Sequence, residues 1–388
     1  SPPRQNVSDS ASHTALARKY RPLTFSEVAT QEHVSDTLRR AVATGRVGHA
    51  YLFSGPRGVG KTTLARVLAM ALNCPERSEG GEPCGTCDDC RRIWSGSTSL
   101  DVVEIDAASN RGVDDARDLR ERAMYAPSDQ GRHKVYIVDE AHMLSRAAAN
   151  ALLKTLEEPP PQLIFILATT EPEKLPPTVL SRCQHYRFRR LADPEIESKL
   201  QRLCEAEGVT SEPGALALLA RSAEGAMRDA ESLLERLLSP GASITRESVA
   251  AALGLPPAER LQELARAISA DDLKAAFQVA AGLYHDGFAP RTLAERLGVT
   301  LRDALVNSLT GGDFTLELDQ DRLLRMIEAL DNEQERFVRR DNLYSLEVAL
   351  IKTVTAGAPA GAGPGADAAP ALPDFDPVGR QPARAAQP

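Results

Sequence analysis

Short apolar runs alternate with amphipathic stretches in the first half of the chain, whereas the second half carries helical patterns only. Continuous apolar runs predict strands that are buried on both faces of a parallel sheet. These runs are 50–54, 100–106, 134–140 and 163–170. Helical patterns at 63–72, 113–124 and 145–158 are typical of the crossovers between parallel strands. The pattern therefore predicts an α/β domain.

After the last apolar run, Gly and Pro residues separate a series of helical patterns. Those at 193–208, 212–223, 226–238 and 246–253 predict a small helical lid domain over 191–254. A second helical region follows at 257–355, with apolar stripes such as 261–268 and 323–330. Such stripes pack either within one chain or between chains, and the pattern fits both arrangements.

Both ends of the chain lack an apolar period. Residues 1–14 are polar, and 356–388 are rich in Pro, Ala and Gly, so we expect an unfolded leader and an unfolded linker. No run approaches the roughly 18 apolar residues of a membrane span, and no secretory leader is visible, so a cytoplasmic protein without membrane contact is expected. The net charge is −8, so any contact with nucleic acid has to come from a local basic surface.

A glycine-rich loop lies between the first predicted strand and the next helix, and it fits the pattern G-x-x-x-x-G-K-[ST]. In such loops the backbone N–H groups face phosphate oxygens, Lys61 reaches the β- and γ-phosphates, and Thr62 is suited to Mg²⁺. A connection without function is the alternative, but the full match and its flanks disfavour it. The predicted nucleotide-binding residues are Gly55, Pro56, Arg57, Gly58, Val59, Gly60, Lys61, Thr62 and Thr63.

Two carboxylates, Asp139 and Glu140, end the predicted strand at 134–140. Because ligands of α/β sheets bind at the carboxyl ends of the strands, Asp139 is predicted to hold Mg²⁺, and Glu140 to orient and deprotonate an attacking water. Taken alone, an Asp-Glu pair also fits the start of a loop or a helix N-cap. The phosphate loop favours the catalytic interpretation.

Four of the six cysteines lie close together in the sequence, with the spacing C-x9-C-x2-C-x2-C. They are Cys74, Cys84, Cys87 and Cys90. Thiolates at such spacing predict a closed, tetrahedral zinc site with a structural role. A redox pair or disulfides are the alternatives, and an intracellular setting disfavours disulfides. Cys183 and Cys204 lack such neighbours and are expected to be ordinary residues.

These features, in this order, resemble the AAA+ clamp-loader ATPases over about residues 15–351. Unrelated NTPases share the phosphate loop, so the resemblance depends on other segments. They are 16–25, the four-Cys insertion at 74–90, 139–145, 150–159 and the triplet 181–183. The resemblance implies an AAA+ domain with a parallel sheet over 15–190, a zinc module at 74–90, a lid over 191–254 and an all-helical oligomerisation collar over 257–355.

The resemblance also implies roles for single residues. Thr170 falls at the first sensor of the γ-phosphate, although a threonine at a strand end also commonly caps the next segment. Arg182 resembles the arginine finger, which acts on the ATP of the neighbouring subunit, and Arg228 resembles the second sensor. Without the resemblance, each arginine would be interpreted as a surface residue. The segment with Arg18, Tyr20 and Arg21 is similar to the border of the adenine and ribose site in this family.

The function that the resemblance implies is an ATPase that loads a ring-shaped sliding clamp onto primed DNA, as part of a DNA-synthesising nucleotidyltransferase assembly. ATP and Mg²⁺ are the implied cofactors, beside structural Zn²⁺. The implied partners are other clamp-loader subunits in a hetero-oligomeric, pentameric ring, the clamp, primed DNA, and a polymerase and helicase reached through a C-terminal extension. Residues 110–111 and 145–146 lie near helix starts and fit either contacts to DNA phosphates or helix caps.

Two other functions stay open. One is a different AAA+ machine, such as a branch-migration motor or a remodelling chaperone, which the four-Cys insertion and the triplet 181–183 disfavour. The other is an assembly platform without catalysis, which the intact Lys61, Asp139 and Glu140 disfavour.

Overall fold

The computed structural model describes residues 15–28, 30–96, 99–109, 127–128, 131–238, 243–312 and 314–357, with the side chains of residues 146 and 151 left out. The predicted leader at 1–14, the predicted helix at 113–124, residues 110–111 and nearly all of the predicted linker therefore lie outside the described residues. The chain divides into two compact units, residues 1–253 and 254–388. Each unit has a hydrophobic core of its own.

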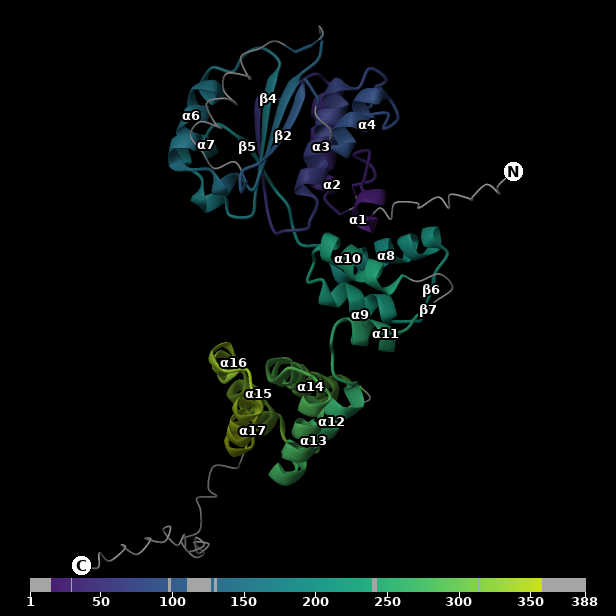
Figure 1. Ribbon diagram of the computed structural model, residues 1–388, viewed down its shortest axis with the longest axis vertical. Coiled ribbons are helices and arrows are strands. Elements are labelled where there is room, and N and C mark those ends of the chain that lie inside the picture. Colours follow the sequence, from purple (N-terminus) through teal and green to yellow (C-terminus); the bar gives the residue numbers. More distant parts are fainter. Residues whose placement is uncertain are drawn as a thin grey trace, which may run out of the picture. The chain divides into compact units, whose positions relative to one another are not determined.

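The first unit contains a five-stranded parallel sheet with helices on both faces (Figure 1). The strand order is β2-β3-β4-β1-β5, so β4 lies between the strand that precedes the phosphate loop and the strand that carries the acid pair. The predicted parallel sheet is confirmed. The strands are β1 (Ala50–Ser54), β2 (Val102–Asp106), β3 (Lys134–Asp139), β4 (Leu163–Thr169) and β5 (Gln184–Arg187).

Helices cover the sheet because alternate strand residues enter two separate cores. Along β1, Tyr51 and Phe53 pack with residues of α2 and α3, whereas Ala50 and Leu52 pack with residues of α6. Successive side chains of a strand point to opposite faces, so covering both faces requires an uninterrupted apolar run. The helices around the sheet are α1 (Leu16–Lys19), α2 (Glu32–Ala43), α3 (Lys61–Asn73), α4 (Asp88–Ser95), α6 (Arg146–Glu157), α7 (Pro177–Leu180) and the 3₁₀ turns η1 (Ala141–Met143) and η2 (Pro172–Lys174).

Strand β5 is absent from the sequence-based expectation. Its residues are Gln-His-Tyr-Arg and are largely exposed, because an edge strand has only one neighbour and needs no apolar run. Just beyond it, the buried side chain of Gln31 pairs with the backbone of Arg189, donating from Nε2 to the carbonyl O at 2.9 Å and accepting from N at 3.2 Å. This side chain satisfies backbone groups where the sheet ends.

The helices predicted between 193 and 253 are present within a few residues and form the lid domain of this unit. Two short strands pair in parallel, and each lies in a loop between two of these helices. No period in the sequence predicts this pair. The elements are α8 (Asp193–Glu207), β6 (Thr210–Ser211), α9 (Ala215–Ser222), α10 (Met227–Leu237), β7 (Ser243–Ile244) and α11 (Arg246–Ala252).

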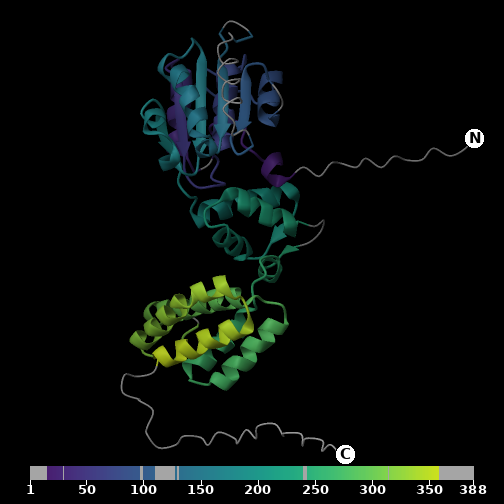
Figure 2. The same cartoon turned by 60° about the vertical axis from the view of Figure 1, so that its left-hand side comes forward.

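The second unit is helical throughout its described part, as predicted, and α17 packs against α12, α13, α14 and α15 (Figure 2). Helix α17 includes Ala356 and Gly357, so these two residues, expected to begin an unfolded linker, are helical. Gly357 is buried, and a Cβ at this position would lie 2.7 Å from Met326 Cγ. Among the described residues, no helix is both long and apolar enough to cross a membrane. The helices are α12 (Ala258–Ser269), α13 (Leu273–His285), α14 (Pro290–Thr310), α15 (Gln320–Asn332), α16 (Gln334–Arg339) and α17 (Leu343–Gly357).

Candidate functional site

A cavity of about 520 Å³ lies at the carboxyl edge of the sheet, between the phosphate loop and the lid. The loop contributes every residue from 57 to 63, and the ends of β2 and β3 contribute three carboxylates. The lid closes the opposite side. The carboxylates are Asp106, Asp139 and Glu140, and the lid residues are Leu191, Glu195, Lys199, Met227, Arg228 and Glu231.

Two glycines of the loop lie where a side chain would come too close to neighbouring atoms. Gly55 has φ 148°, and a Cβ there would lie 2.5 Å from the carbonyl O of Phe188. Gly58 has φ 75°, and its Cβ would lie 3.1 Å from the Cβ of Ala226, directly before α10. The backbone N of Arg228 in turn approaches the carbonyl O of Gly58 at 3.4 Å. The loop therefore fits closely between β5 and the lid, where a side chain would force them apart.

Lys61 is the first residue of α3, and only 7% of it is exposed. Its Nζ donates to the carbonyl oxygens of Gly55 at 2.8 Å and of Pro56 at 2.6 Å. Burial lowers the pKa of Lys61, while the nearby carboxylates of Glu140 and Asp139 raise it. The loop thus holds one cation at its centre, as a site for an anion requires.

Thr62 and Asp139 meet although 77 positions separate them in the sequence. Thr62 Oγ1 donates to Asp139 Oδ2 at 2.7 Å, and Asp139 Oδ1 accepts from the backbone N of Glu140 at 2.9 Å. A hydroxyl and a carboxylate oxygen side by side are ligands that Mg²⁺ prefers. These two side chains fit the predicted magnesium site.

The arginines with implied roles occupy different places. Arg228 and Arg21 line the cavity, and burial, followed by repulsion from Arg66, lowers the pKa of Arg21. Arg182 does not line it: its Nη2 pairs with Glu157 Oε1 at 2.6 Å, on the surface beside α6 and α7. The Arg182 guanidinium also donates from Nη1 to the carbonyl O of Thr178 at 2.6 Å and lies away from the cavity lining of its own chain.

The structure separates three other implied residues from the cavity lining. Thr170 follows the end of β4 and does not line the cavity. Tyr20 donates from its hydroxyl to Glu207 Oε1 at 2.7 Å, at the end of α8. Arg18 Nη2 lies 3.4 Å from the carbonyl O of Ser95. The border of the cavity near α1 is instead formed by Ala17, Arg21 and Pro22.

Of the charged lid residues that line the cavity, sequence reasoning assigned Arg228 and missed Glu195, Lys199 and Glu231. Glu195 and Lys199 lie one turn apart on α8, and Arg228 and Glu231 lie one turn apart on α10. Lys199 Nζ pairs with Glu231 Oε1 at 2.7 Å, and the Glu231 side chain is 7% exposed. Their i,i+4 and i,i+3 spacing places each pair on one helix face. The sequence does not show that these faces turn toward the loop.

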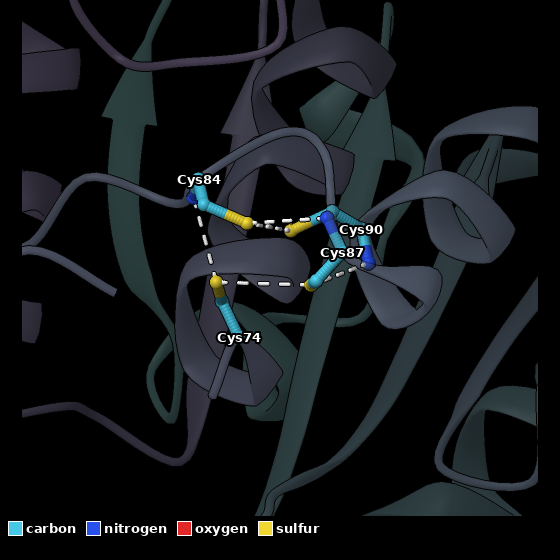
Figure 3. Close-up of side chains that lie close together, drawn as sticks. All are labelled: Cys74, Cys84, Cys87 and Cys90. Atoms are coloured by element: carbon cyan, nitrogen blue, oxygen red, sulfur yellow. Dashed lines mark hydrogen bonds between the residues drawn. The ribbon is translucent and has the colours of Figure 1, made fainter. Parts of the chain in front are cut away.

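The four predicted cysteine ligands come together at the end of α3 and the start of α4 (Figure 3). Their sulfurs all lie within 4.8 Å of one another, with Cys74 Sγ and Cys84 Sγ each 4.0 Å from a second sulfur, those of Cys87 and Cys90 respectively. A tetrahedral zinc ion bound at about 2.3 Å places its sulfurs about 3.8 Å apart. The cluster therefore fits the size of a zinc site.

Backbone N–H groups also point at this cluster. Cys84 N donates to Cys74 Sγ at 3.4 Å, Cys87 N to Cys84 Sγ at 3.3 Å and Cys90 N to Cys87 Sγ at 3.4 Å. Burial alone would raise the pKa of Cys84, but N–H donors from Cys87 and Thr86 lower it to about 7. Burial raises the pKa of Cys74 and of Cys90. A bound cation is the agent that can keep all four sulfurs as thiolates.

Ser145, one of the candidates for a DNA phosphate contact, is an N-cap. Its Oγ accepts from the backbone N of Ala148 at 3.1 Å and so satisfies the first turn of α6. The cap is thus the role that the structure gives to this hydroxyl.

Two family models match the chain. The model for the DNA polymerase III delta subunit matches residues 30–192, and the model for the DNA polymerase III clamp loader subunit, ATPase lid domain, matches residues 195–242. Together the two models cover most of the sheet domain and most of the lid.

Curated relatives match most of the chain. DNA polymerase III subunit gamma/tau of Mycobacterium tuberculosis is 47% identical over 75% of this chain and 51% of its own length. Subunit tau of Escherichia coli is 44% identical over 82% of this chain and 50% of its own length. Subunit gamma of Buchnera aphidicola is 40% identical over 67% of this chain and 70% of its own length. The chain spans about half the length of the first two.

Solved structures give a more distant likeness. The Thermotoga maritima RuvB Holliday junction branch migration motor matches 68% of this chain and 85% of its own chain, with 20% sequence identity and a TM-score of 0.45. A likeness at this level carries no conclusion about function.

Proposed function

The chain belongs to the DNA polymerase III gamma/tau subunit family, and from this premise we propose that it is the ATP-driven motor of a clamp loader, which opens a ring-shaped sliding clamp and loads it onto primed DNA. One observation carries the catalytic part of the proposal. Lys61, Thr62, Asp139 and Glu140 meet in one cavity, which the lid closes with Arg228. An assembly platform without catalysis has no need of this set.

The residues act on ATP mainly through charge and position. Lys61 donates to the β- and γ-phosphates from the centre of the loop, and the loop N–H groups hold the same phosphates. Thr62 and Asp139 would hold Mg²⁺, which when bound offsets phosphate charge. Glu140 accepts a proton from water, the water oxygen forms a bond to the γ-phosphorus, and the bond from that phosphorus to the bridging oxygen of ADP breaks.

We assign the two arginines to different subunits. Arg228 at the start of α10 contacts the γ-phosphate bound to its own chain, so that the lid responds to the nucleotide. Arg182, paired with Glu157 away from the cavity, is the arginine finger for a neighbouring subunit. Thr170 is the first sensor, at the end of the strand between the loop and the acid pair.

The zinc ion is proposed to be structural. It would be held by all four cysteines, which leaves no open position for chemistry, and it would fix the segment between α3 and α4. This segment has little other regular structure, so the binding energy of the ion becomes part of its folding energy.

The remaining proposals concern the assembly. Other clamp-loader subunits would form a hetero-oligomeric, pentameric ring with this chain through the second unit, whose surface exposes Val338 and Tyr344. A C-terminal extension would contact a polymerase and a helicase. The assembly would act in the cytoplasm. Nucleotidyl transfer is assigned to the polymerase of the assembly, because this cavity carries the residues of phosphate hydrolysis. The four-Cys cluster and the relatives disfavour another AAA+ machine.

ATP turnover of the reconstituted complex, measured with clamp and primed DNA together and with each alone, tests the proposal. A clamp loader is expected to hydrolyse ATP fastest when both are present. Glu140→Gln is expected to bind ATP and hold clamp and DNA while turnover falls by about 10²- to 10⁴-fold. Turnover that responds equally to either partner alone, or that survives Glu140→Gln, would contradict the proposal.

A further inference from the structure

The imidazole of His142 lies between Glu140 and the end of β4. Its side chain is 10% exposed, and its Nδ1 is 3.0 Å from Thr169 Oγ1 and 3.5 Å from Glu140 Oε2. On the other side of the ring, Nε2 is 3.5 Å from Glu171 Oε2. The ring therefore connects the proposed base with a buried hydroxyl and a second carboxylate.

Glu140 has an oxygen that needs such a neighbour. Its backbone lies in the left-handed region, with φ 46° and ψ 44°, directly after β3. The side chain is 35% exposed, yet Oε2 is buried and has no hydrogen-bond partner among the described residues. An unpaired buried carboxylate oxygen is costly. Nδ1 of His142 is close enough that a small rotation of the ring or the carboxylate completes a hydrogen bond.

Thr169 is the second residue beside Nδ1 of His142. The residue is fully buried at the end of β4, and its Oγ1 accepts from the backbone N of Glu171 at 3.1 Å. Its carbonyl O accepts from the backbone N of Gly55, the first residue of the phosphate loop, at 3.2 Å. One residue thus contacts both the loop and the imidazole ring.

The two neighbours of Nδ1 differ in what they can do. Thr169 Oγ1 can donate as well as accept, whereas the ionised Glu140 carboxylate only accepts. A hydrogen on Nδ1 therefore has two competing acceptors, and only one of them is the proposed catalytic base. The direction of that N–H decides whether Oε2 of Glu140 is held or free.

We propose that His142 is a positioning residue for Glu140. Its Nδ1–H donates to Glu140 Oε2 and fixes the carboxylate so that the other oxygen faces the attacking water. His142 exchanges no proton in the step: the water proton goes to Glu140. The inference rests on the ATPase function proposed above, and it adds a contact that no motif in the sequence assigns.

Substitutions of His142 separate positioning from packing. The amide nitrogen of Asn can replace Nδ1, and that of Gln can replace Nε2. We expect His142→Ala to lower kcat by about 10- to 100-fold, the worth of a hydrogen bond to a charged group, with little change in KM for ATP. His142→Asn should restore most of the loss, and His142→Gln should not. His33→Ala is the control, since that exposed ring contacts the carbonyl O of Arg187 and does not line the cavity.

A second measurement does not depend on turnover. In ¹⁵N-histidine NMR spectra of the full chain, Glu140→Gln should shift the Nδ1 resonance of His142, whereas Glu173→Gln, at a nearby exposed carboxylate, should not. Equal kcat for His142→Ala and wild type, or equal losses in all three variants together with lower thermal stability, would overturn the positioning role. If Glu140→Gln itself stays active, the proposed ATPase chemistry fails instead.

Discussion

The nucleotide cavity and the four-Cys cluster lie in the same unit but are built in opposite ways. All four cysteines of the cluster come from residues 74–90, and the segment closes on itself. The cavity takes its side chains from α1, the loop, β2, β3 and the lid, over more than two hundred positions from Ala17 to Glu231. The cluster is therefore a local structure, whereas the cavity exists only when the whole unit has folded.

The two sites also differ in the charge of the ligand that each one favours. In the cavity, Lys61 is buried and Arg21 is half-buried; burial lowers the pKa of both cations, and the acid pair partly offsets this effect for Lys61. An anion such as a triphosphate relieves the strain of these cations. In the cluster, burial raises the pKa of Cys74 and Cys90, so these thiols gain from a cation. The charges of the cavity therefore favour an anion, and the thiols of the cluster favour a cation.

Lys61→Ala gives the largest expected effect and separates the two sites. Without the ammonium at the centre of the loop, ATP hydrolysis should be abolished and ATP binding greatly weakened, because Lys61 is the buried cation that the loop holds for the β- and γ-phosphates. Zinc content and the circular dichroism spectrum should be unchanged. Lys154→Ala, an exposed lysine of α6, is the matched control. Near-normal turnover in Lys61→Ala would show that this cavity does not drive the protein.

Arg182→Ala tests whether the cavity is complete within one chain. ATP binding to the isolated chain should be nearly unchanged, while hydrolysis in the assembled complex should fall by about 10³-fold or more. In complexes that mix Arg182→Ala with Lys61→Ala subunits, activity should return where an intact Lys61 site faces an intact Arg182.

Glu157→Gln is the control for Arg182, because it breaks the ion pair and keeps the guanidinium. If it lowers hydrolysis as much as Arg182→Ala does, or if the mixed complexes stay inactive, Arg182 has a structural role at the edge of the sheet and does not act in trans.

The same contrast explains what the sequence could reveal. The cysteine ligands and the phosphate loop are continuous motifs, so spacing alone predicted which side chains would meet. Strands β1, β3 and β4 were predictable because both of their faces are buried. Strand β5 was not, since an exposed edge tolerates polar residues, and the lid pair Lys199 and Glu231 depends on how α8 and α10 pack. Long-range packing has no local signature.

Cys87→Ser is expected to act on the cluster and to spare the chemistry. Wild-type protein should contain about one zinc per chain, since four thiolates complete a tetrahedral site. Loss of one thiolate opens the site and should cost at least about 2 kcal/mol, or about 4–8 °C in Tm for a unit of this size. ATP affinity should change much less. Cys204→Ser, in the lid core, is the control that lowers stability without lowering zinc content. Metal-free protein purified under reducing conditions would contradict the zinc proposal.

The smallest effect concerns the border of the cavity near α1. Tyr20→Phe removes one hydrogen bond to Glu207, which Lys19 also contacts at 2.7 Å, so the free energy of unfolding should fall by about 1 kcal/mol and ATP affinity should stay within about twofold. Arg21→Ala should instead weaken ATP binding by about 10-fold, because its guanidinium lines the cavity. Fluorescent-nucleotide titration of both variants decides between them. An affinity loss in Tyr20→Phe as large as that in Arg21→Ala would place Tyr20 at the bound nucleotide and extend the cavity beyond its described lining.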